Sequence, residues 1–505
     1  MASEAKADGD LPPEPSMSAP PDAVTGMEDL KGALGLDRSL AARGRRRTPL
    51  RDWPYLLRWL PAGAAIGMVA GLGALALHGL LSLVTYAALG LLGGFFPATV
   101  AASGRSSPAT EIGIPWAVPL LVAGGAVLAA LLGRWLAPDA GGFGADAAIK
   151  AIHHEPRAMK GRNAVVTVVI SALTLGTGGS GGTEGPITLT SAAFGMVSAR
   201  VLRLSDADAR VAATAGVAAG IGAIFQAPLG GVLLGVELLY RRDIAPEMLI
   251  PSLIATAVAY AEFAAVCGFG PMFGDQLAGV VDLAHLPLFL GLGLLAGLVA
   301  RCYCWNLHRA KAFFDARREI PWPVKPAVGG LAVGALGLLL PGVLGTSYGV
   351  AQSDMDAEWL LGTPVWVLLA LPFAKVVGTS LTVGSGGPAG VFGPAMVIGA
   401  ATGAVCWRLM EMSGFPVPGP VPFVVAGMAA CVGAAARVPL AAVIMATEAT
   451  GAVDHLIPTA IAVTAATAIM GDRTLYPSQP MKRSQPRCGR ACTTRPPAGS
   501  PPATS

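Results

Sequence analysis

Two glycine-rich stretches carry the residues of this sequence that are best suited to bind a small anion. The first runs Gly176-Thr-Gly-Gly-Ser-Gly-Gly-Thr-Glu184-Gly-Pro186, and the second runs Gly384-Ser-Gly-Gly-Pro-Ala-Gly-Val-Phe392-Gly-Pro394. Each ends in Gly-Pro before a new apolar stretch, and proline is favoured in the first turn of a helix. The pattern predicts a loop that leads into a helix N-terminus, whose free N–H groups and positive dipole end attract an anion without a permanent charge.

Glycine-rich runs are also typical of flexible linkers and of nucleotide-binding loops. The linker is disfavoured because both runs lie between apolar segments and recur at equivalent places. The nucleotide-binding loop is disfavoured because no Gly-Lys-Ser or Gly-Lys-Thr follows either run. A helix dipole holds an anion weakly enough to release it, as conduction requires.

Glu184 is the only carboxylate between Arg162 and Arg200, and it lies within the first glycine-rich stretch. Burying a carboxylate in an apolar setting is costly unless it serves a purpose. Its negative charge could occupy the site built for an anion, and the alternative is a helix-capping glutamate exposed to water. The equivalent residue in the second stretch is the apolar Phe392. One stretch therefore offers a charged side chain that can block the site and move away, and the other offers an apolar side chain that stays in place.

The composition predicts an all-α polytopic membrane protein. Hydrophobic residues make up 53% of the 505 positions and charged residues only 13%, with a mean hydropathy of +0.60. Membrane helices accept glycine and proline for close packing and deliberate interruption, so the 66 glycines and 41 prolines predict many short, tilted or broken helices. The segments long enough to cross a hydrocarbon core without a charged residue include 61–96, 112–133, 211–236, 326–353, 376–407 and 412–436.

An internal repeat divides the membrane part into two halves. Pro394 lies 208 positions after Pro186, at the same place in its glycine-rich stretch. A second match pairs Gly222-Ala223, Pro228-Leu229 and Glu237 with Gly433-Ala434, Pro439-Leu440 and Glu448. We predict a first membrane repeat at 51–270 and a second at 271–476, related as inverted repeats with the functional site between them near the midplane.

Both ends of the chain are polar and basic. Residues 1–50 lack apolar periodicity and end in an arginine-rich run, and residues 477–505 are again rich in Pro, Ser, Thr and Arg. We predict that both segments are disordered and cytoplasmic, because loops rich in Lys and Arg stay on the cytoplasmic side. The expected location is the cell membrane, with membrane lipid around the chain.

These motifs resemble those of the CLC family of voltage-gated chloride channels and proton–chloride exchangers, of the bacterial type without CBS domains. Thr183-Glu184-Gly185-Pro186 resembles the family's G-[KR]-E-G-P loop, with Thr183 in place of the usual basic residue. Gly390-Val-Phe-Gly-Pro394 fits the family's G-x-F-x-P motif, and the resemblance extends over about residues 60–476. It implies a homodimer with one pore per subunit, which carries chloride and needs no cofactor, metal or nucleic acid.

The resemblance also implies roles for particular residues. Glu184 would be the gating glutamate, backbone N–H groups of the second stretch would hold chloride, and the hydroxyl of Tyr476 would donate to it. The implied anion-binding residues are Gly185, Val391, Phe392, Gly393, Tyr476, Phe143 and Gly144.

Two departures from the family pattern affect the expected mechanism. The family's G-S-G-I-P motif corresponds to Gly142-Phe143-Gly144-Ala145-Asp146, and a phenyl ring offers no hydrogen-bond donor where the serine would. We therefore expect a weaker or differently selective inner anion site. The internal glutamate of proton-coupled members is replaced by Leu238, so we expect chloride movement that is uncoupled from protons or only loosely coupled.

Glu237, which precedes Leu238, has two interpretations. It could belong to a proton path together with Glu184. Because it recurs as Glu448, it could instead be a structural carboxylate that ties a helix end, and this interpretation is favoured.

Three functions follow from these patterns. The predicted function is a chloride channel, the alternative is a proton-coupled chloride exchanger, and the remote alternative is a phosphate-binding membrane enzyme or sensor. An enzyme would need clustered His, Asp, Glu or Cys side chains within the spans. The apolar stretches hold little beyond Glu184, Glu237, Glu448 and Lys375, so the sequence predicts an ion channel or transporter and not an enzyme.

Overall fold

The computed structural model describes residues 53–101, 107–138, 142, 144–154, 158–276 and 282–482. In this part of the chain the regular elements are helices, apart from one isolated β-bridge. The predicted all-α class is therefore confirmed. The prediction for residues 1–50 lies outside the described residues.

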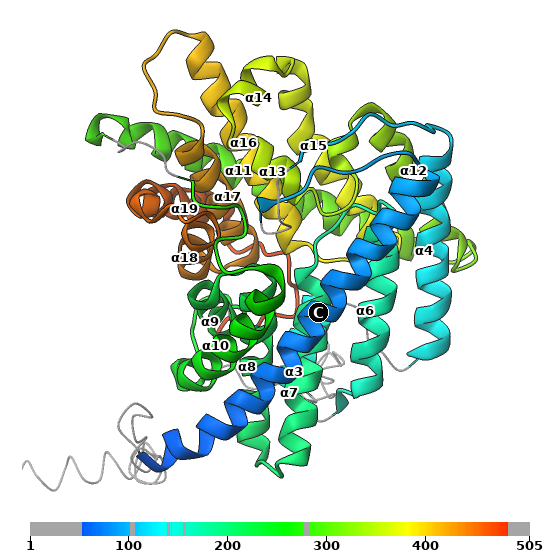
Figure 1. Cartoon of the computed structure of the whole chain (residues 1–505), viewed down its shortest axis with the longest axis vertical. Coiled ribbons are helices and arrows are strands. Elements are labelled where there is room, and N and C mark those ends of the chain that lie inside the picture. The colour runs from blue at the N-terminus through cyan, green and yellow to red at the C-terminus, as the bar shows by residue number, and fades with distance from the viewer. Residues whose placement is uncertain are drawn as a thin grey trace, which may run out of the picture. The chain divides into compact units, whose positions relative to one another are not determined.

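The helices can be followed along the chain as two successive series (Figure 1). The first series consists of α3 Trp53–Thr85, α4 Ala117–Leu136, α6 Gly161–Gly176, α7 Glu184–Val201, α8 Asp206–Ile224, α9 Pro228–Glu237 and α10 Leu249–Cys267. The second consists of α11 Leu286–Ala316, α12 Val324–Leu339, α15 Val365–Gly384, α16 Phe392–Met412, α17 Val421–Ala436, α18 Pro439–Thr450 and α19 Leu456–Met470. Outside the two series lie the π-helical continuation η2 Tyr86–Leu92, α5 Ala145–His154, α13 Tyr348–Ser353 and α14 Ala357–Gly362.

Helix lengths differ widely among the described residues. Eight helical segments are long and apolar enough to cross a membrane. Others are apolar but short, and α9, with ten residues, would extend only about 15 Å at 1.5 Å per residue. The hydrocarbon core is about 30 Å thick, so such helices cannot span it alone. The expectation of short helices is confirmed.

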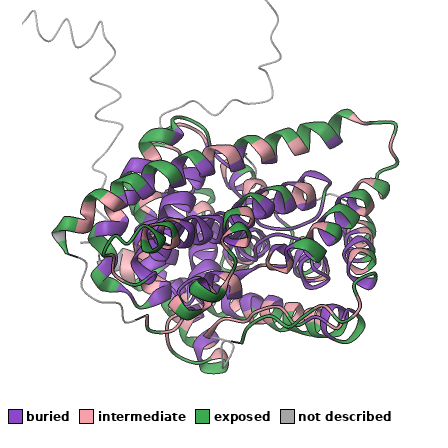
Figure 2. Cartoon of the chain, turned by 90° about the horizontal axis from the view of Figure 1, so that it is seen from above, coloured by how far each residue is buried: buried purple, intermediate pink, exposed green. Residues whose placement is uncertain are grey.

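The surface of the chain suits a lipid environment. Large apolar side chains are exposed along the outer helices, while the inner helices are buried (Figure 2). Helix α4 carries a tryptophan at each end, with Trp116 72% and Trp135 81% exposed. Tryptophan is enriched at the two membrane–water interfaces, and twenty residues match the thickness between them.

Repeat-related glycines bring consecutive helices into backbone contact. A Cβ atom at Gly195 of α7 would lie 2.3 Å from the carbonyl oxygen of Ala212 in α8. At the equivalent position of α16, a Cβ atom at Gly403 would lie 2.1 Å from the carbonyl oxygen of Phe423 in α17. Any larger residue would push these helices apart, which explains in physical terms why both halves carry glycine here.

The predicted boundary of the disordered tail at residue 477 is wrong for its first residues, 477–482. Their backbone is bonded to the rest of the chain, because the N–H groups of Arg241 and Arg242 donate to the carbonyl oxygens of Pro480 and Met481 at 3.0 and 3.2 Å. Sequence composition does not register such pairing, since it needs no particular side chains. Residues 483–505 lie outside the described residues.

Candidate anion-binding site

The two glycine-rich stretches pair directly with each other. The N–H group of Gly182 donates to the carbonyl oxygen of Gly390 at 2.9 Å, and the N–H group of Gly390 donates back to Gly182 at 2.8 Å. A Cβ atom at Gly185 would lie 2.6 Å from the Cα atom of Gly390 and 3.5 Å from that of Gly144. The first residues of α5, α7 and α16 therefore meet at one place.

Glu184 is the first residue of α7, and its side chain is only 1% exposed. Its Oε1 atom accepts a hydrogen bond of 2.7 Å from the N–H group of Phe392, the first residue of α16. Its Oε2 atom accepts one of 3.1 Å from the hydroxyl of Tyr348. The carboxylate thus occupies the N-terminus of a helix from the other half. The alternative of a water-exposed capping glutamate is wrong.

Glycines make room for this carboxylate. A Cβ atom at Gly390 would lie 2.2 Å from Oε1, and Cβ atoms at Gly182 and Gly393 would lie 2.1 and 2.7 Å from Oε2 of Glu184. Any residue larger than glycine at these positions would therefore collide with the carboxylate. The Oε1 atom accepts from a backbone N–H group at a helix start, a kind of place that favours negative charge.

Lys375 and Tyr348 complete the site, and neither was assigned to it from the sequence. The Lys375 side chain, fully buried in α15, donates to Ser347 Oγ at 2.7 Å and to the carbonyl oxygens of Gly345 and Val343 at 2.9 and 3.1 Å. These bonds hold the turn that leads into α13, where Ser347 has a φ of 62°. The one available signal was a polar cluster, Gly345-Thr-Ser-Tyr-Gly, inside an otherwise apolar segment.

Val391, expected to offer its N–H group to chloride, is fixed through its carbonyl group. The hydroxyl of Tyr303, buried in α11, donates to the carbonyl oxygen of Val391 at 3.0 Å. Tyr303 was also missed by sequence reasoning, because it lies mid-helix with no motif around it. The anion-binding role of Val391 remains a prediction.

Tyr476 is buried in the same apolar cluster as Phe392 and lies within electrostatic range of Glu184. The segment after it is held by Asp146 at the start of α5, whose carboxylate accepts from the N–H group and the hydroxyl of Ser478, both at 2.9 Å. Asp146 was noted as a departure from the family motif, and the structure gives it a positioning contact two residues beyond Tyr476. Phe143 lies outside the described residues, so its predicted effect stays a prediction.

Glu237 and Glu448 tie the two halves together reciprocally. Glu237, at the end of α9, accepts from the N–H groups of Leu440 and Ala441 in α18 at 3.4 and 2.8 Å. Glu448 in α18 accepts from the N–H groups of Leu229 and Gly230 in α9 at 3.1 and 2.8 Å. Each carboxylate therefore caps the helix that carries the other one.

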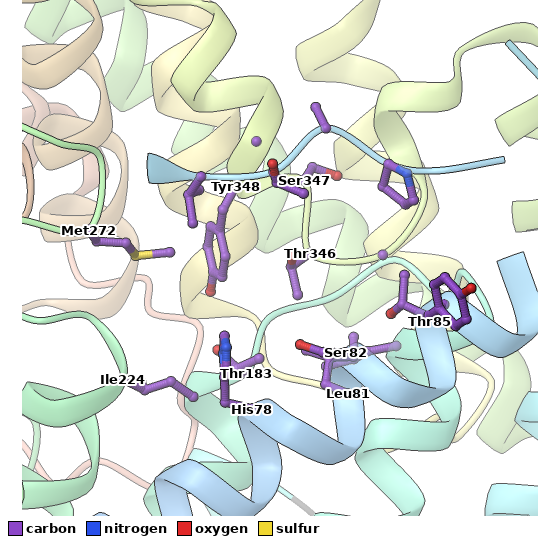
Figure 3. Close-up of a pocket in the computed structure, with 18 of the residues that line it drawn as sticks. His78, Leu81, Ser82, Thr85, Thr183, Ile224, Met272, Thr346, Ser347 and Tyr348 are labelled. Atoms are coloured by element: carbon purple, nitrogen blue, oxygen red, sulfur yellow. The ribbon is translucent and has the colours of Figure 1, made fainter. Parts of the chain in front are cut away.

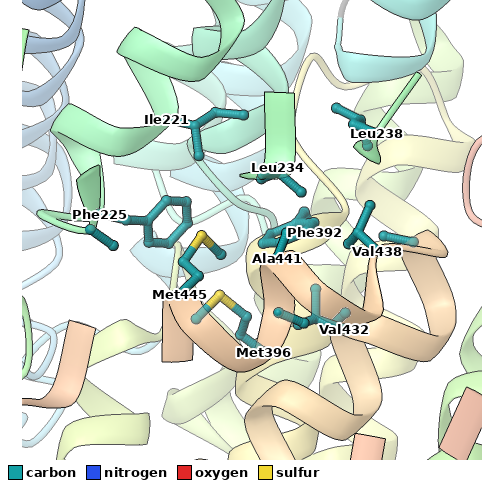
Figure 4. Close-up of a cluster of buried hydrophobic side chains, with 14 of the residues drawn as sticks. Ile221, Phe225, Leu234, Leu238, Phe392, Met396, Val432, Val438, Ala441 and Met445 are labelled. Carbon is teal, nitrogen blue, oxygen red and sulfur yellow. The ribbon is translucent and has the colours of Figure 1, made fainter. Parts of the chain in front are cut away.

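One side of the site is apolar. Figure 4 shows the Phe392 ring among apolar side chains from α9 and α18, next to Phe225 at the end of α8, whose ring centroid lies 6.3 Å away. Leu238, the residue that replaces a family glutamate, is 2% exposed and belongs to the same buried cluster. At this position the chain therefore has an apolar side chain that cannot carry a proton.

The other side faces a cavity of about 500 Å³. Tyr348 and Thr183 line it next to Glu184, and His78 and Ser82 of α3 line it from the far side (Figure 3). No cluster of metal-ligating side chains occurs among the described residues.

Comparisons with known proteins agree with this geometry. Residues 124–471 match the family model described as voltage gated chloride channel. The chain belongs to the voltage-gated chloride channel (CLC) family. It is 31% identical to a ClcB-like chloride channel protein of Ralstonia nicotianae, over 70% of this chain and 82% of that protein. It is 28% identical to the H(+)/Cl(-) exchange transporter ClcA of Yersinia pestis, over 69% of this chain and 75% of that protein.

Among solved structures, a slow cyanobacterial Cl−/H+ antiporter superposes with a TM-score of 0.67. Its sequence identity is 22%, and the match covers 83% of this chain and 96% of the antiporter. At this identity the likeness concerns the fold, and it agrees with an integral membrane protein of the CLC architecture.

Proposed function

We propose that this CLC protein is a chloride channel in which Glu184 gates an anion path between the N-termini of α7 and α16. The observation that supports the proposal is the hydrogen bond from the Phe392 N–H group to the Glu184 carboxylate, across the two halves. A charged carboxylate excludes an anion from this place, and a displaced or protonated one admits it. The path uses helix dipoles and N–H groups, so it needs no cofactor and no covalent chemistry.

The passive mode is favoured by the residues on the apolar side. Leu238 cannot receive a proton, and Glu237 could turn inward only by giving up its two hydrogen bonds to α18. Breaking both would leave the buried N–H group of Ala441 without an acceptor, which costs about 1–3 kcal/mol. This cost disfavours a proton path through Glu237.

A proton-coupled chloride exchanger is the second candidate. It is favoured by the similarity to a relative named as an H(+)/Cl(-) exchange transporter. In either mode we propose a homodimer with one path per subunit, located in the cell membrane with both termini in the cytoplasm.

Liposomes that contain the purified protein and a chloride gradient distinguish the two modes. With the voltage clamped by valinomycin and potassium, we expect chloride to move down its gradient and the internal pH to stay constant, because Leu238 cannot accept a proton and the Glu237 carboxylate is bonded to α18. Internal pH is followed with a trapped fluorescent dye.

If a chloride gradient drove protons against their own gradient under the voltage clamp, the channel function would be contradicted and the exchanger function supported. The Glu184→Gln protein serves as the control, since an exchanger that uses this carboxylate would lose proton movement and keep anion flux. Absence of chloride flux from the wild-type protein would contradict both modes.

A further inference from the structure

We propose that the hydroxyl of Tyr348 is a hydrogen-bond donor to the permeating anion, at the outer end of the path, and that it favours chloride over weak hydrogen-bond acceptors. The inference rests on the proposed function, because it assigns a ligand to the same anion site. In the structure this hydroxyl donates to Glu184 Oε2, while the Phe392 N–H group donates to Oε1. The two donors thus converge on one carboxylate from different helices.

The position of the hydroxyl places it directly on the anion route. Tyr348 lines the cavity of about 500 Å³, together with Thr183 (Figure 3). A Cβ atom at Gly393 would lie 2.1 Å from the Tyr348 hydroxyl, so only a glycine in the first turn of α16 lets the hydroxyl come this close. The hydroxyl thus lies between the cavity lining and the first turn of α16, where an anion entering from the cavity would come close to it.

The tyrosine is held independently of Glu184. Its side chain is 7% exposed, and its ring packs edge-on against Phe225 with the centroids 5.8 Å apart. Its backbone follows Ser347, whose hydroxyl accepts from the buried Lys375 ammonium group at 2.7 Å. The hydroxyl should therefore stay in place when the carboxylate leaves, and its bond to Glu184 Oε2 is then lost.

A halide can replace that acceptor. An O–H group donated to an anion forms a charge-assisted hydrogen bond, which is stronger than one between neutral groups. Chloride accepts such a bond better than thiocyanate, whose charge is spread over three atoms. The hydroxyl is thus expected to replace part of the hydration shell that chloride loses on entering the site. For thiocyanate it should replace a smaller part.

The test uses the Glu184→Ala protein, in which no carboxylate competes with the anion or with the hydroxyl. Adding Tyr348→Phe should weaken chloride binding by about tenfold, because a hydrogen bond to a charged group is lost. The ratio of chloride flux to thiocyanate flux in liposomes should fall as well. Binding is measured by titration calorimetry on the full-length protein, with its melting temperature as a check of folding.

The matched control is Tyr86→Phe in the same Glu184→Ala background. Tyr86 lines the same cavity, but its hydroxyl does not donate to Glu184, so its removal should change neither quantity. If Tyr348→Phe left both the chloride affinity and the flux ratio unchanged, the role of Tyr348 would be overturned and the proposed function would stand. Failure of the Glu184→Ala protein itself to bind or pass chloride would overturn the proposed function, and the assignment with it.

Discussion

Replacing Glu184 by glutamine is expected to make anion flux nearly independent of pH between 5 and 8. In the wild-type protein, flux should rise as the pH falls, because protonation removes the charge that competes with chloride for the N-terminus of α16. The protonated fraction of a single group changes by up to about tenfold for each pH unit. The flux of the wild-type protein can therefore change severalfold between pH 5 and 8. Flux is measured as chloride efflux from liposomes buffered at each pH.

Other titratable groups lie around this carboxylate and must be separated from it. Tyr303, Tyr348, Tyr476 and Lys375 are within electrostatic range of Glu184, and His78 lines the adjoining cavity. The matched control is His78→Gln, which should keep the wild-type pH profile. A Glu184→Gln protein that also kept this profile would show that another group is the gate.

Replacing Lys375 by methionine is expected to lower the free energy of unfolding by about 3 kcal/mol. The methionine fills a similar volume but leaves Ser347 Oγ and the carbonyl oxygens of Gly345 and Val343 without their donor. Buried acceptors that lose a partner cost about 1–3 kcal/mol each, and relaxation recovers part of this. Unfolding is followed by tryptophan fluorescence in detergent.

Lys325→Met provides the comparison for this prediction. The Lys325 side chain, at the start of α12, donates to a single acceptor, the carbonyl oxygen of Phe314, at 2.7 Å and is only partly buried. Its replacement should cost less than about 1 kcal/mol, since water can take over the bond. Equal destabilisation by the two substitutions would mean that the turn before α13 does not depend on Lys375.

The features that the sequence predicted well are those that occur twice. The glycine-rich stretches recur with equal spacing, which predicted two equivalent helix starts, and the structure has them at Glu184 and Phe392. Their role in anion binding stays a prediction. Glu237 and Glu448 recur as well, and the structure explains this through their reciprocal bonds to α18 and α9. A sequence repeat indicates that the same local structure occurs in both halves. Where these equivalent structures contact each other, the same interaction can form twice.

The features that the sequence did not predict are those that occur in one half only. Lys375, Tyr348 and Tyr303 reach the site through hydrogen bonds between residues far apart in the chain, and no spacing rule connects them. Their residue types gave a hint, because a polar side chain in an apolar span is costly unless it is paired. The partner of such a side chain depends on how the helices pack, which a single sequence does not specify.

The most direct test of this account is the position of bromide in crystals of the wild-type and Glu184→Ala proteins. We expect anomalous density between the Phe392 N–H group and the Tyr348 hydroxyl in the Glu184→Ala protein only, because the wild-type carboxylate fills that place. A site near Phe392 and Tyr476 should bind bromide in both proteins. Two results would contradict the claim that Glu184 and the anion compete for one site. One is density in the Glu184→Ala crystals that lies only away from the N-terminus of α16, and the other is wild-type density between the Phe392 N–H group and the Tyr348 hydroxyl while the carboxylate keeps both of its bonds.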